Sequence, residues 1–354
     1  MADFFFKYAR IKGMSVTLGE ERHSFDEEPL YWNNNETLCK RLKKTIGFGI
    51  RYWAKPETTT ADLCFDAASR LLKATDVKPE NVDAIISVTQ TPDYLMPGNA
   101  HVLHERLGLP KSCAALDIEL GCTGFLFALQ NAYMMIECGA KRVLIVAGDT
   151  LSKTINTKDR TEAPLFCDIG SACVVEREER ETYSYFSLRS DGTGVQKMLQ
   201  PAGGYRIPST EETRKEKADK EGNIRSDENF YMNGLEVFNF TLSEQPPLLR
   251  DILEQSRKTK EEIDYYIFHQ GNSYIVENLA KNLKLPSEKV PVIFPDYGNQ
   301  SCASIPGTIC AALSDKLSEK KQMIFQAFGI GLSWGACQLE LANLTVLPPV
   351  VYGE

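Results

Sequence analysis

The chain has no long hydrophobic run and no pattern typical of a secretory leader. In its 354 residues no apolar stretch approaches the roughly 20 residues that a membrane span needs. The ten cysteines include no Cys-x-x-Cys pair, which argues against a zinc site or dithiol centre of that kind. These absences predict a cytoplasmic protein with free thiols, no membrane partner and no metal.

Positive charge and histidine are both scarce. The 40 Lys and Arg residues are outnumbered by 48 Asp and Glu residues, which gives a net charge of −8 and argues against nucleic acid as a partner. With only four histidines, few side chains can act as a base. His101 and His104 share a segment expected to be helical, but no further metal ligands accompany them, and His23 lies in a charged stretch.

The most informative motif is Gly-Cys-Thr-Gly-Phe at residues 121–125. It follows an apolar segment, 114–118, that predicts a buried strand. It precedes apolar residues spaced as on one face of a helix: Phe125, Leu129, Ala132 and Ile136. Cys122 therefore lies where a strand turns into a helix, and the helix N-terminus favours its nucleophilic thiolate. Burial would oppose this, and a plain packing role for Cys122 stays open unless a base and an oxyanion site accompany it.

Two polar segments farther along offer such partners. His269 ends the predicted core strand 265–268, and residues at the C-terminal ends of strands in α/β sheets line ligand crevices. Asn299 lies in a glycine-containing turn, 297–306, that leads into a helix of small residues. Each has a structural alternative: a buried core histidine for His269, and a helix cap for Asn299.

Taken together, the three segments resemble the ketoacyl-acyl-carrier-protein synthase III family of the thiolase superfamily. That family carries Cys-[Ala/Thr]-Gly-Phe, His-Gln-x-Asn and Gly-Asn-x-Ser-x-Ala-Ser-x-Pro motifs, and all three occur here in order, at Cys122, His269 and Asn299. Further matches run through residues 1–340, including Gly49-Ile50-Arg51 and the glycine-rich segment 328–335. The resemblance implies an α/β, thiolase-like fold of two similar halves, packed as layered helices and sheets.

The chain also looks internally duplicated. Residues 78–86 echo 260–267, and residues 144–148 echo 324–329. We therefore expect an N-terminal half, residues 1–175, that carries the nucleophile. A C-terminal half, residues 176–354, would carry the catalytic His and Asn. Residues 211–228 are almost devoid of apolar side chains, which predicts a solvated loop whose charges need no function.

The resemblance implies a decarboxylating condensation that needs no cofactor. Cys122 would take the acyl group from an acyl-CoA or acyl-carrier thioester. His269 and Asn299 would hydrogen-bond the enolate formed from a malonyl-type thioester. The oxyanion hole would combine the backbone N–H groups of Cys122 and Ile330. The family usually has glycine where Ile330 stands, and isoleucine disfavours a positive φ.

The resemblance also assigns residues outside the catalytic centre, with some departures. Arg51, Lys281 and Asn272 match positions that face coenzyme A or the acyl carrier protein. Two basic positions of that surface are instead Tyr274 and Asn239, and the coenzyme-stacking tryptophan before Gly-Ile-Arg has no clear counterpart. A nearby basic run could compensate or could be a solvated helix face: Lys40, Arg41, Lys43 and Lys44.

Met96 and Phe238 match the walls of the acyl tunnel. In the family the residue at the Met96 position reaches across a homodimer, so a homodimer is implied here; the alternative for Met96 is a core methionine. The departures favour a specialised condensing enzyme over the initiator of fatty-acid synthesis. Acyl length and extender unit stay open. Two other classes also stay open: an acyltransferase that passes the acyl group to an alcohol or amine, and an inactive subunit of a hetero-oligomer.

Overall fold

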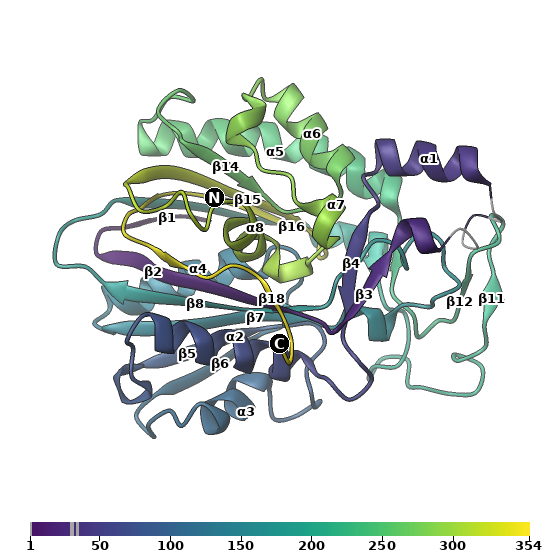
Figure 1. Cartoon of the computed structure of the whole chain (residues 1–354), viewed down its shortest axis with the longest axis horizontal. Coiled ribbons are helices and arrows are strands. Elements are labelled where there is room, and N and C mark those ends of the chain that lie inside the picture. Colours follow the sequence, from purple (N-terminus) through teal and green to yellow (C-terminus); the bar gives the residue numbers. More distant parts are fainter. Residues whose placement is uncertain (1, 29–31, 33–34) are drawn as a thin grey trace.

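Two mixed β-sheets lie face to face in the chain, with helices between them and on both outer faces (Figure 1). The structure is a computed structural model and describes residues 2–28, 32 and 35–354. The first sheet contains, in spatial order, β17 (Thr345–Val346), β2 (Ala9–Leu18), β8 (Ile169–Arg177), β7 (Arg142–Asp149), β5 (Ala84–Val88) and β6 (Ala114–Ile118), with β18 (Val350–Val351) also on β2. The second contains β1 (Ala2–Phe6), β9 (Ser184–Ser190), β16 (Ser333–Leu341), β15 (Lys321–Gly329) and β14 (Tyr265–Phe268).

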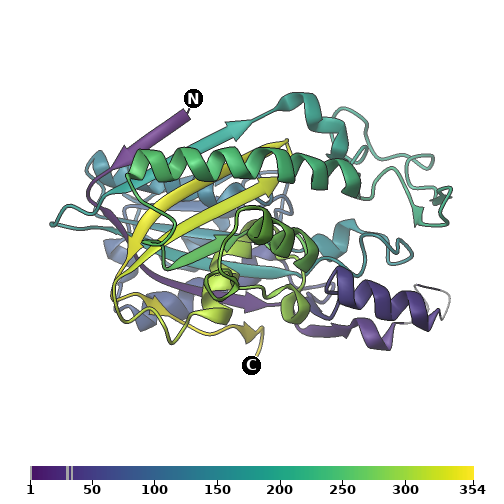
Figure 2. The same cartoon turned by 90° about the horizontal axis from the view of Figure 1, so that it is seen from above.

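Helices complete a five-layer arrangement. Between the sheets lie α4 (Gly124–Glu137) and α8 (Ser304–Ala312), which contact strands of both. The first sheet is covered on its outer face by α2 (Thr60–Ala74) and α3 (Asn99–Arg106). The second is covered by α5 (Gly234–Ser256) and α6 (Ser273–Asn282), and Figure 2 shows α5 crossing it as a long helix. No helix within residues 2–28, 32 and 35–354 is both long and apolar enough to cross a bilayer.

Shorter elements gather at one end of the layers (Figures 1 and 2). They comprise α1 (Glu36–Thr45), α7 (Phe294–Tyr297), and the strand pairs β3 (Glu21–Ser24) with β4 (Ile50–Trp53), β10 (Met198–Leu199) with β13 (Tyr231–Met232), and β11 (Lys217–Ala218) with β12 (Ile224–Arg225). Short 3-10 helices include η4 (Leu151–Thr154) after β7, η5 (Gly192–Lys197) after β9, and η7 (Ser301–Ala303) between α7 and α8. This end of the molecule frames the cavities described below.

The two sheets repeat one strand pattern. In the first, β5 pairs parallel with β7, which pairs antiparallel with β8, and β8 with β2. In the second, β14, β15, β16 and β9 follow the same sequence of pairings. The chain ends are exchanged, because β1 joins the second sheet and β17 and β18 join the first. Residue 175 lies inside β8, and a division of the chain there stays a prediction.

The prediction of a buried strand at 114–118 is wrong about burial. A strand does form there as β6, but three of its five residues are exposed and the other two are only partly buried, with Leu116 37% exposed. The reason is its place at the edge of the first sheet, where it pairs only with β5. An apolar run therefore marks an uncovered edge of this chain. The helix predicted after it is correct, since Phe125, Leu129, Ala132 and Ile136 are buried on α4.

The prediction of a solvated loop at 211–228 also needs correction. Its strands β11 and β12 form a hairpin that is tied to the loop after β7 by charged side chains. Arg225 binds Asp159 at 2.8 Å, and Lys158 binds Glu216 at 2.7 Å. Because these pairs hold the hairpin against the body, its charged residues form part of a cavity wall.

Candidate active site

Cys122 lies in the turn between β6 and α4, as expected, and its side chain faces the end of β15. It is 7% exposed. A Cβ placed on Gly329 would be 2.6 Å from both the Cβ and the Sγ of Cys122. No real Cβ contact is that short, so the last residue of β15 must be glycine for the thiol to keep this position.

Burial decides the ionisation of the nucleophile. It raises the pKa of the Cys122 thiol to about 12, although the backbone N–H groups of Ile330 and Cys122 act in the opposite direction. The thiol is therefore neutral at rest and needs a base when it attacks. Both N–H groups act on the same sulfur, which is the arrangement that an oxyanion hole requires.

Isoleucine at position 330 does not distort the turn. Ile330 keeps a negative φ, and the following Gly331 takes the left-handed conformation at φ +133°. The residue that must take a positive φ in this turn is therefore Gly331, and glycine takes such a φ without steric cost. A backbone donor at Ile330 is compatible with its side chain.

His269 follows the last residue of β14 and is buried, with 2% of its surface exposed. Its backbone N–H donates to the Gln326 carbonyl at 2.8 Å, and its ring packs edge-on against Phe328 at 5.4 Å. Burial lowers the pKa of the imidazole to about 3, so the ring is neutral. Its Nδ1 has no hydrogen-bond partner among the described residues. A neutral ring can both accept a proton and donate one N–H.

Asn299 is held on both sides by backbone hydrogen bonds. Its N–H donates to the Leu165 carbonyl at 2.8 Å, and its carbonyl accepts the Cys167 N–H at 2.9 Å. Its side-chain Oδ1 accepts the Ser301 N–H at 3.0 Å, so it caps the η7 turn that precedes α8. Since Oδ1 already accepts a hydrogen bond, the Nδ2 group is the part of the Asn299 side chain that can donate hydrogen bonds to a substrate.

Contacts link the three segments. Cys122 and His269 pack against the consecutive residues Gly329 and Phe328 at the end of β15. The N–H of Gln270, next to His269, donates to Ser304 Oγ at 2.8 Å, in the first residue of α8. A nucleophile, a neutral imidazole and an amide donor thus meet where α4, β14 and α8 approach the same strand end.

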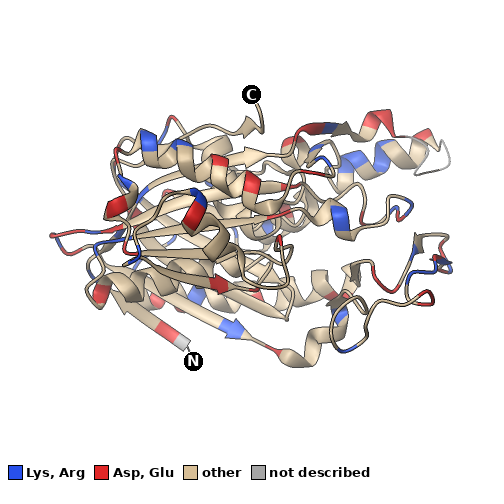
Figure 3. Ribbon diagram, turned by 90° about the horizontal axis from the view of Figure 1, so that it is seen from below, with Lys and Arg blue, Asp and Glu red and all other residues tan. Residues whose placement is uncertain are grey.

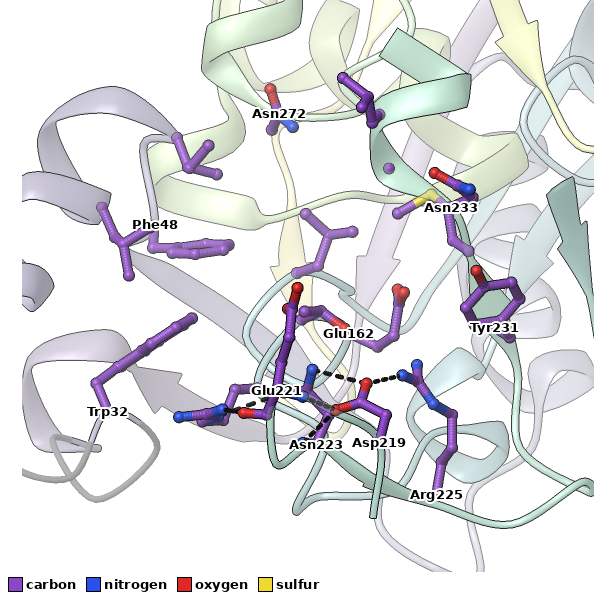
Figure 4. A pocket seen from close by; sticks show the side chains of 18 residues that line it. Trp32, Phe48, Glu162, Asp219, Glu221, Asn223, Arg225, Tyr231, Asn233 and Asn272 are labelled. Atoms are coloured by element: carbon purple, nitrogen blue, oxygen red, sulfur yellow. Dashed lines mark hydrogen bonds and ion pairs between the residues drawn. The ribbon is translucent and has the colours of Figure 1, made fainter. Parts of the chain in front are cut away.

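A cavity of about 500 Å³ opens on the Asn299 side of this centre (Figure 4). We call it the α1 cavity, because α1 forms one wall; the β11–β12 hairpin and the first turns of α5 and α6 form the others. Leu165 belongs to its lining, and the Leu165 carbonyl accepts the Asn299 N–H. The cavity therefore comes within one residue of Asn299, although Cys122, His269 and Asn299 are not themselves in its lining.

A second cavity, of about 440 Å³, lies on the Ile330 side. We call it the Ile330 cavity. Its lining is largely apolar and consists of Gln90, Glu119, Leu120, Leu151, Thr154, Val195, Met198, Leu199, Gln200, Phe230, Ile330 and Gly331. The Gln90 side chain also lies against Gly121, beside the nucleophile, where a Cβ would be 2.3 Å from Gln90 Oε1. An acyl group on Cys122 would find apolar surface here.

The residues assigned to coenzyme A or the carrier are not all at the α1 cavity. Asn272 lines it and caps α6. Lys281 is exposed at the end of α6 and is outside the lining. Arg51 does not fit the predicted role: it is 1% exposed, and Glu28 accepts from its two terminal nitrogens at 2.9 and 3.0 Å. This guanidinium holds β4 in place, because a buried charge must be paired.

Of the two predicted acyl-tunnel residues, Phe238 is misplaced. It stacks on Tyr274 at 5.3 Å between α5 and α6, and it lines neither cavity. Met96 is 75% exposed, which excludes the alternative of a core methionine.

Sequence reasoning missed the tryptophan of the α1 cavity. Trp32 lies at its rim, with the guanidinium of Arg160 over the ring at 5.7 Å. The family resemblance places a coenzyme-stacking tryptophan directly before Gly-Ile-Arg. In this chain Trp32 is separated from that motif by α1. An aromatic ring beside a guanidinium suits stacking with a flat ligand group.

Comparisons with known proteins decide the family. The family description 3-Oxoacyl-[acyl-carrier-protein (ACP)] synthase III matches residues 116–192, and its C-terminal part matches 253–341. A beta-ketoacyl-[acyl-carrier-protein] synthase III of Caldanaerobacter subterraneus is 37% identical, over 88% of this chain and 91% of its own length.

The chain belongs to the beta-ketoacyl-acyl-carrier-protein synthase III family. A solved structure of a 3-oxoacyl-(acyl-carrier protein) synthase from Burkholderia xenovorans covers 99% of this chain and 98% of its own, with TM-score 0.92 and 36% identity. The synthase III structure from Thermus thermophilus covers 94% and 99%, with TM-score 0.80 and 32% identity. The predicted family, thiolase-like α/β fold and condensing-enzyme class are confirmed.

Proposed function

We propose that Cys122, His269 and Asn299 carry out a decarboxylating Claisen condensation in two half-reactions. In the first, Cys122 Sγ attacks the carbonyl carbon of an acyl thioester, and His269 takes the thiol proton. The N–H groups of Cys122 and Ile330 bind the oxyanion until the C–S bond of the donor breaks, and His269 gives the proton to the departing thiolate. The observation that carries this proposal is the position of the Cys122 thiol against Gly329, with both amides acting on its sulfur.

In the second half-reaction, a malonyl-type thioester binds in place of the departed thiol. Loss of carbon dioxide leaves an enolate, whose oxygen accepts hydrogen bonds from His269 and Asn299 Nδ2. The enolate carbon then attacks the acyl-Cys122 carbonyl, the Cys122–acyl bond breaks, and the released thiolate takes up one proton from solvent to restore the neutral thiol. Uncharged donors suit this step, because a carboxylate at position 299 would repel the enolate.

The acyltransferase alternative is weaker on the same geometry. Transfer to an alcohol or amine needs a general base, which His269 could supply, but it forms no enolate and would leave the Asn299 amide donor without a function. An inactive subunit is also disfavoured, since the centre retains its nucleophile, its imidazole and its amide. Intact-protein mass spectrometry after exposure to a panel of acyl-CoA and acyl-carrier donors would separate the three functions.

We expect the chain to form a homodimer through the edge of the first sheet. Strand β6 is uncovered there, and Tyr94, Leu95 and Met96 are 60%, 82% and 75% exposed. An uncovered edge with adjacent apolar side chains is a typical pairing surface, and a two-fold axis would bring Met96 to a second copy. Light scattering should give twice the mass of the chain. Leu116→Glu should lower that mass, and Tyr183→Gln, in the loop between β8 and β9, should not; a fully active monomer would refute the dimer.

We further expect weak recognition of the standard fatty-acid carrier. Tyr274 and Asn239 are exposed and uncharged where basic residues were expected. Within α1, Glu36 pairs with Lys40, and Asp26 of the 3-10 turn η1 (Phe25–Glu27) pairs with Lys43. Figure 3 shows acidic as well as basic residues at this end of the molecule. Surface charges govern association and specificity more than chemistry.

Steady-state kinetics should therefore show a high KM and near-normal turnover with the standard carrier, and a lower KM with a dedicated carrier or a coenzyme A thioester. If the standard carrier gives the lowest KM, and Tyr274→Arg does not lower it further, the enzyme serves general fatty-acid synthesis instead.

A further inference from the structure

The α1 cavity contains a buried carboxyl group that the proposed chemistry does not use. Glu162 is 1% exposed and lines the cavity; neither of its carboxyl oxygens has a partner of ordinary hydrogen-bond geometry among the described residues, and the Met232 N–H acts on the carboxyl only weakly. Figure 4 shows it in the interior of the cavity, below Asn272 and beside Tyr231. Buried polar groups are nearly always paired, so an unpaired carboxyl facing a cavity indicates a missing ligand.

The neighbouring arginines do not neutralise Glu162. Asp159 and Asp219 accept from Arg225, while Asn223 and the Glu221 carbonyl accept from Arg160. Burial, together with the charge of Asp159, raises the pKa of Glu162 to about 8, against a smaller opposing effect of Arg225 and the Met232 amide. The titratable and charged groups around the cavity are Asp159, Arg160, Asp219, Glu221, Arg225 and Tyr231.

Two amide donors accompany Glu162 in the lining. Asn233 Oδ1 accepts the Glu236 N–H at 3.2 Å, and Asn272 Oδ1 accepts the Ile275 N–H at 2.8 Å, so each side chain caps a helix. Their Nδ2 groups have no hydrogen-bond partner in the described part of the chain. The cavity thus offers a carboxyl acceptor and two N–H donors. An amide group is their complement, because it offers one N–H and one C=O.

We propose that Glu162 contributes to binding of the thioester donor by accepting the hydrogen bond of an amide N–H in its pantetheine arm, while Asn233 or Asn272 binds an amide carbonyl. This inference rests on the proposed function, since the α1 cavity is taken as the path of the thioester to Cys122. Coenzyme A and a carrier's prosthetic group share this arm. Glu162 would therefore contact the pantetheine arm, and it would not contact the nucleotide or the carrier protein.

The test uses Glu162→Met, which removes both acceptors at similar size, and Glu162→Gln, which keeps one acceptor but cannot ionise. Glu212→Met and Glu212→Gln, at an exposed position on the same hairpin segment, are the matched controls. Loss of a hydrogen bond to a charged group corresponds to roughly a tenfold change in binding. Above a pH of about 8, where Glu162 is ionised, Glu162→Met should raise KM about tenfold for both acetyl-coenzyme A and S-acetylpantetheine, with kcat within about twofold, and the controls should match wild type.

The pH dependence gives a second readout. An amide N–H favours the ionised carboxyl, so the wild-type KM should fall as pH rises toward about 8 and level off above it, whereas both Glu162 variants should lack this change. An equal KM in Glu162→Met and wild type would overturn the proposal. An effect confined to acetyl-coenzyme A would also overturn it, because Glu162 would then read the nucleotide.

Stability without ligand separates this role from a structural one. The pKa of Glu162 is raised by folding, so the native state holds a proton that the unfolded state releases, and wild type loses stability as pH rises from its ordinary value of 4.5 to about 8. Glu162→Met should therefore melt at a higher temperature than wild type at pH 8, and by a smaller margin at pH 5. A lower melting temperature at both pH values would make Glu162 a structural residue. Acylation of Cys122 in these variants, followed by mass, reports on the proposed function independently.

Discussion

Cys122→Ala is expected to abolish acylation and to lower condensation roughly a thousandfold or more. The buried thiol, held against Gly329 and acted on by the N–H groups of Ile330 and Cys122, is the nucleophile assigned to the acyl carbonyl. The variant should keep decarboxylating a malonyl thioester, because His269 and Asn299 act on the enolate without the sulfur. Intact-protein mass after incubation with acetyl-coenzyme A measures the first effect, and carbon dioxide release measures the second.

Cys138→Ala, at an exposed cysteine, is the control for this experiment and should acylate as wild type does. Acyl mass on another cysteine with Cys122 free would contradict the assignment of the nucleophile. Loss of decarboxylation together with acylation would contradict the separation of the two half-reactions.

Asn299→Ala and His269→Ala should impair condensation far more than acylation. Removal of one donor to a developing oxyanion typically lowers turnover by about 100- to 1000-fold. Asn299 meets only the enolate, so acylation of Asn299→Ala should stay within about tenfold of wild type. His269 is neutral, with a pKa lowered to about 3, and can also accept the thiol proton, so acylation should fall further in His269→Ala.

Stopped-time mass spectrometry gives the acylation rate, and product formation from a malonyl thioester gives the condensation rate. Asn299→Asp is the matched variant for charge: it keeps the size of the side chain, and it should condense no faster than Asn299→Ala. Equal loss of both half-reactions in Asn299→Ala would refute its assignment to the enolate.

Much of the fold and the core of the site could be predicted, because they depend on local patterns. The helical face from Phe125 to Ile136 and the strand before His269 follow from the spacing of apolar residues, and both are buried as expected. Each of the three motifs contains a catalytic residue and the turn in which it lies. In the structure the turns of Cys122 and His269 meet at the end of β15.

What could not be predicted depends on contacts between distant segments. Whether β6 is buried depends on its position in the sheet and not on its apolar sequence. The burial of Arg51 depends on Glu28, and the cavity wall formed by residues 219–225 depends on the pair between Arg225 and Asp159. Position at a helix N-terminus favours a low pKa for the Cys122 thiol, and burial favours a high one. Only the packed structure shows that burial has the larger effect.

The decarboxylating condensation is tested most directly by following what becomes of the acyl-enzyme when a malonyl thioester is added. The wild-type enzyme is acylated with acetyl-coenzyme A, separated from excess donor, and mixed with a malonyl thioester while the mass of the protein and the products are followed. We expect the acyl group to leave Cys122, and one β-ketoacyl thioester and one carbon dioxide to form for each acyl group lost. An acyl-enzyme that persists with the malonyl thioester but discharges to an alcohol or amine would contradict it.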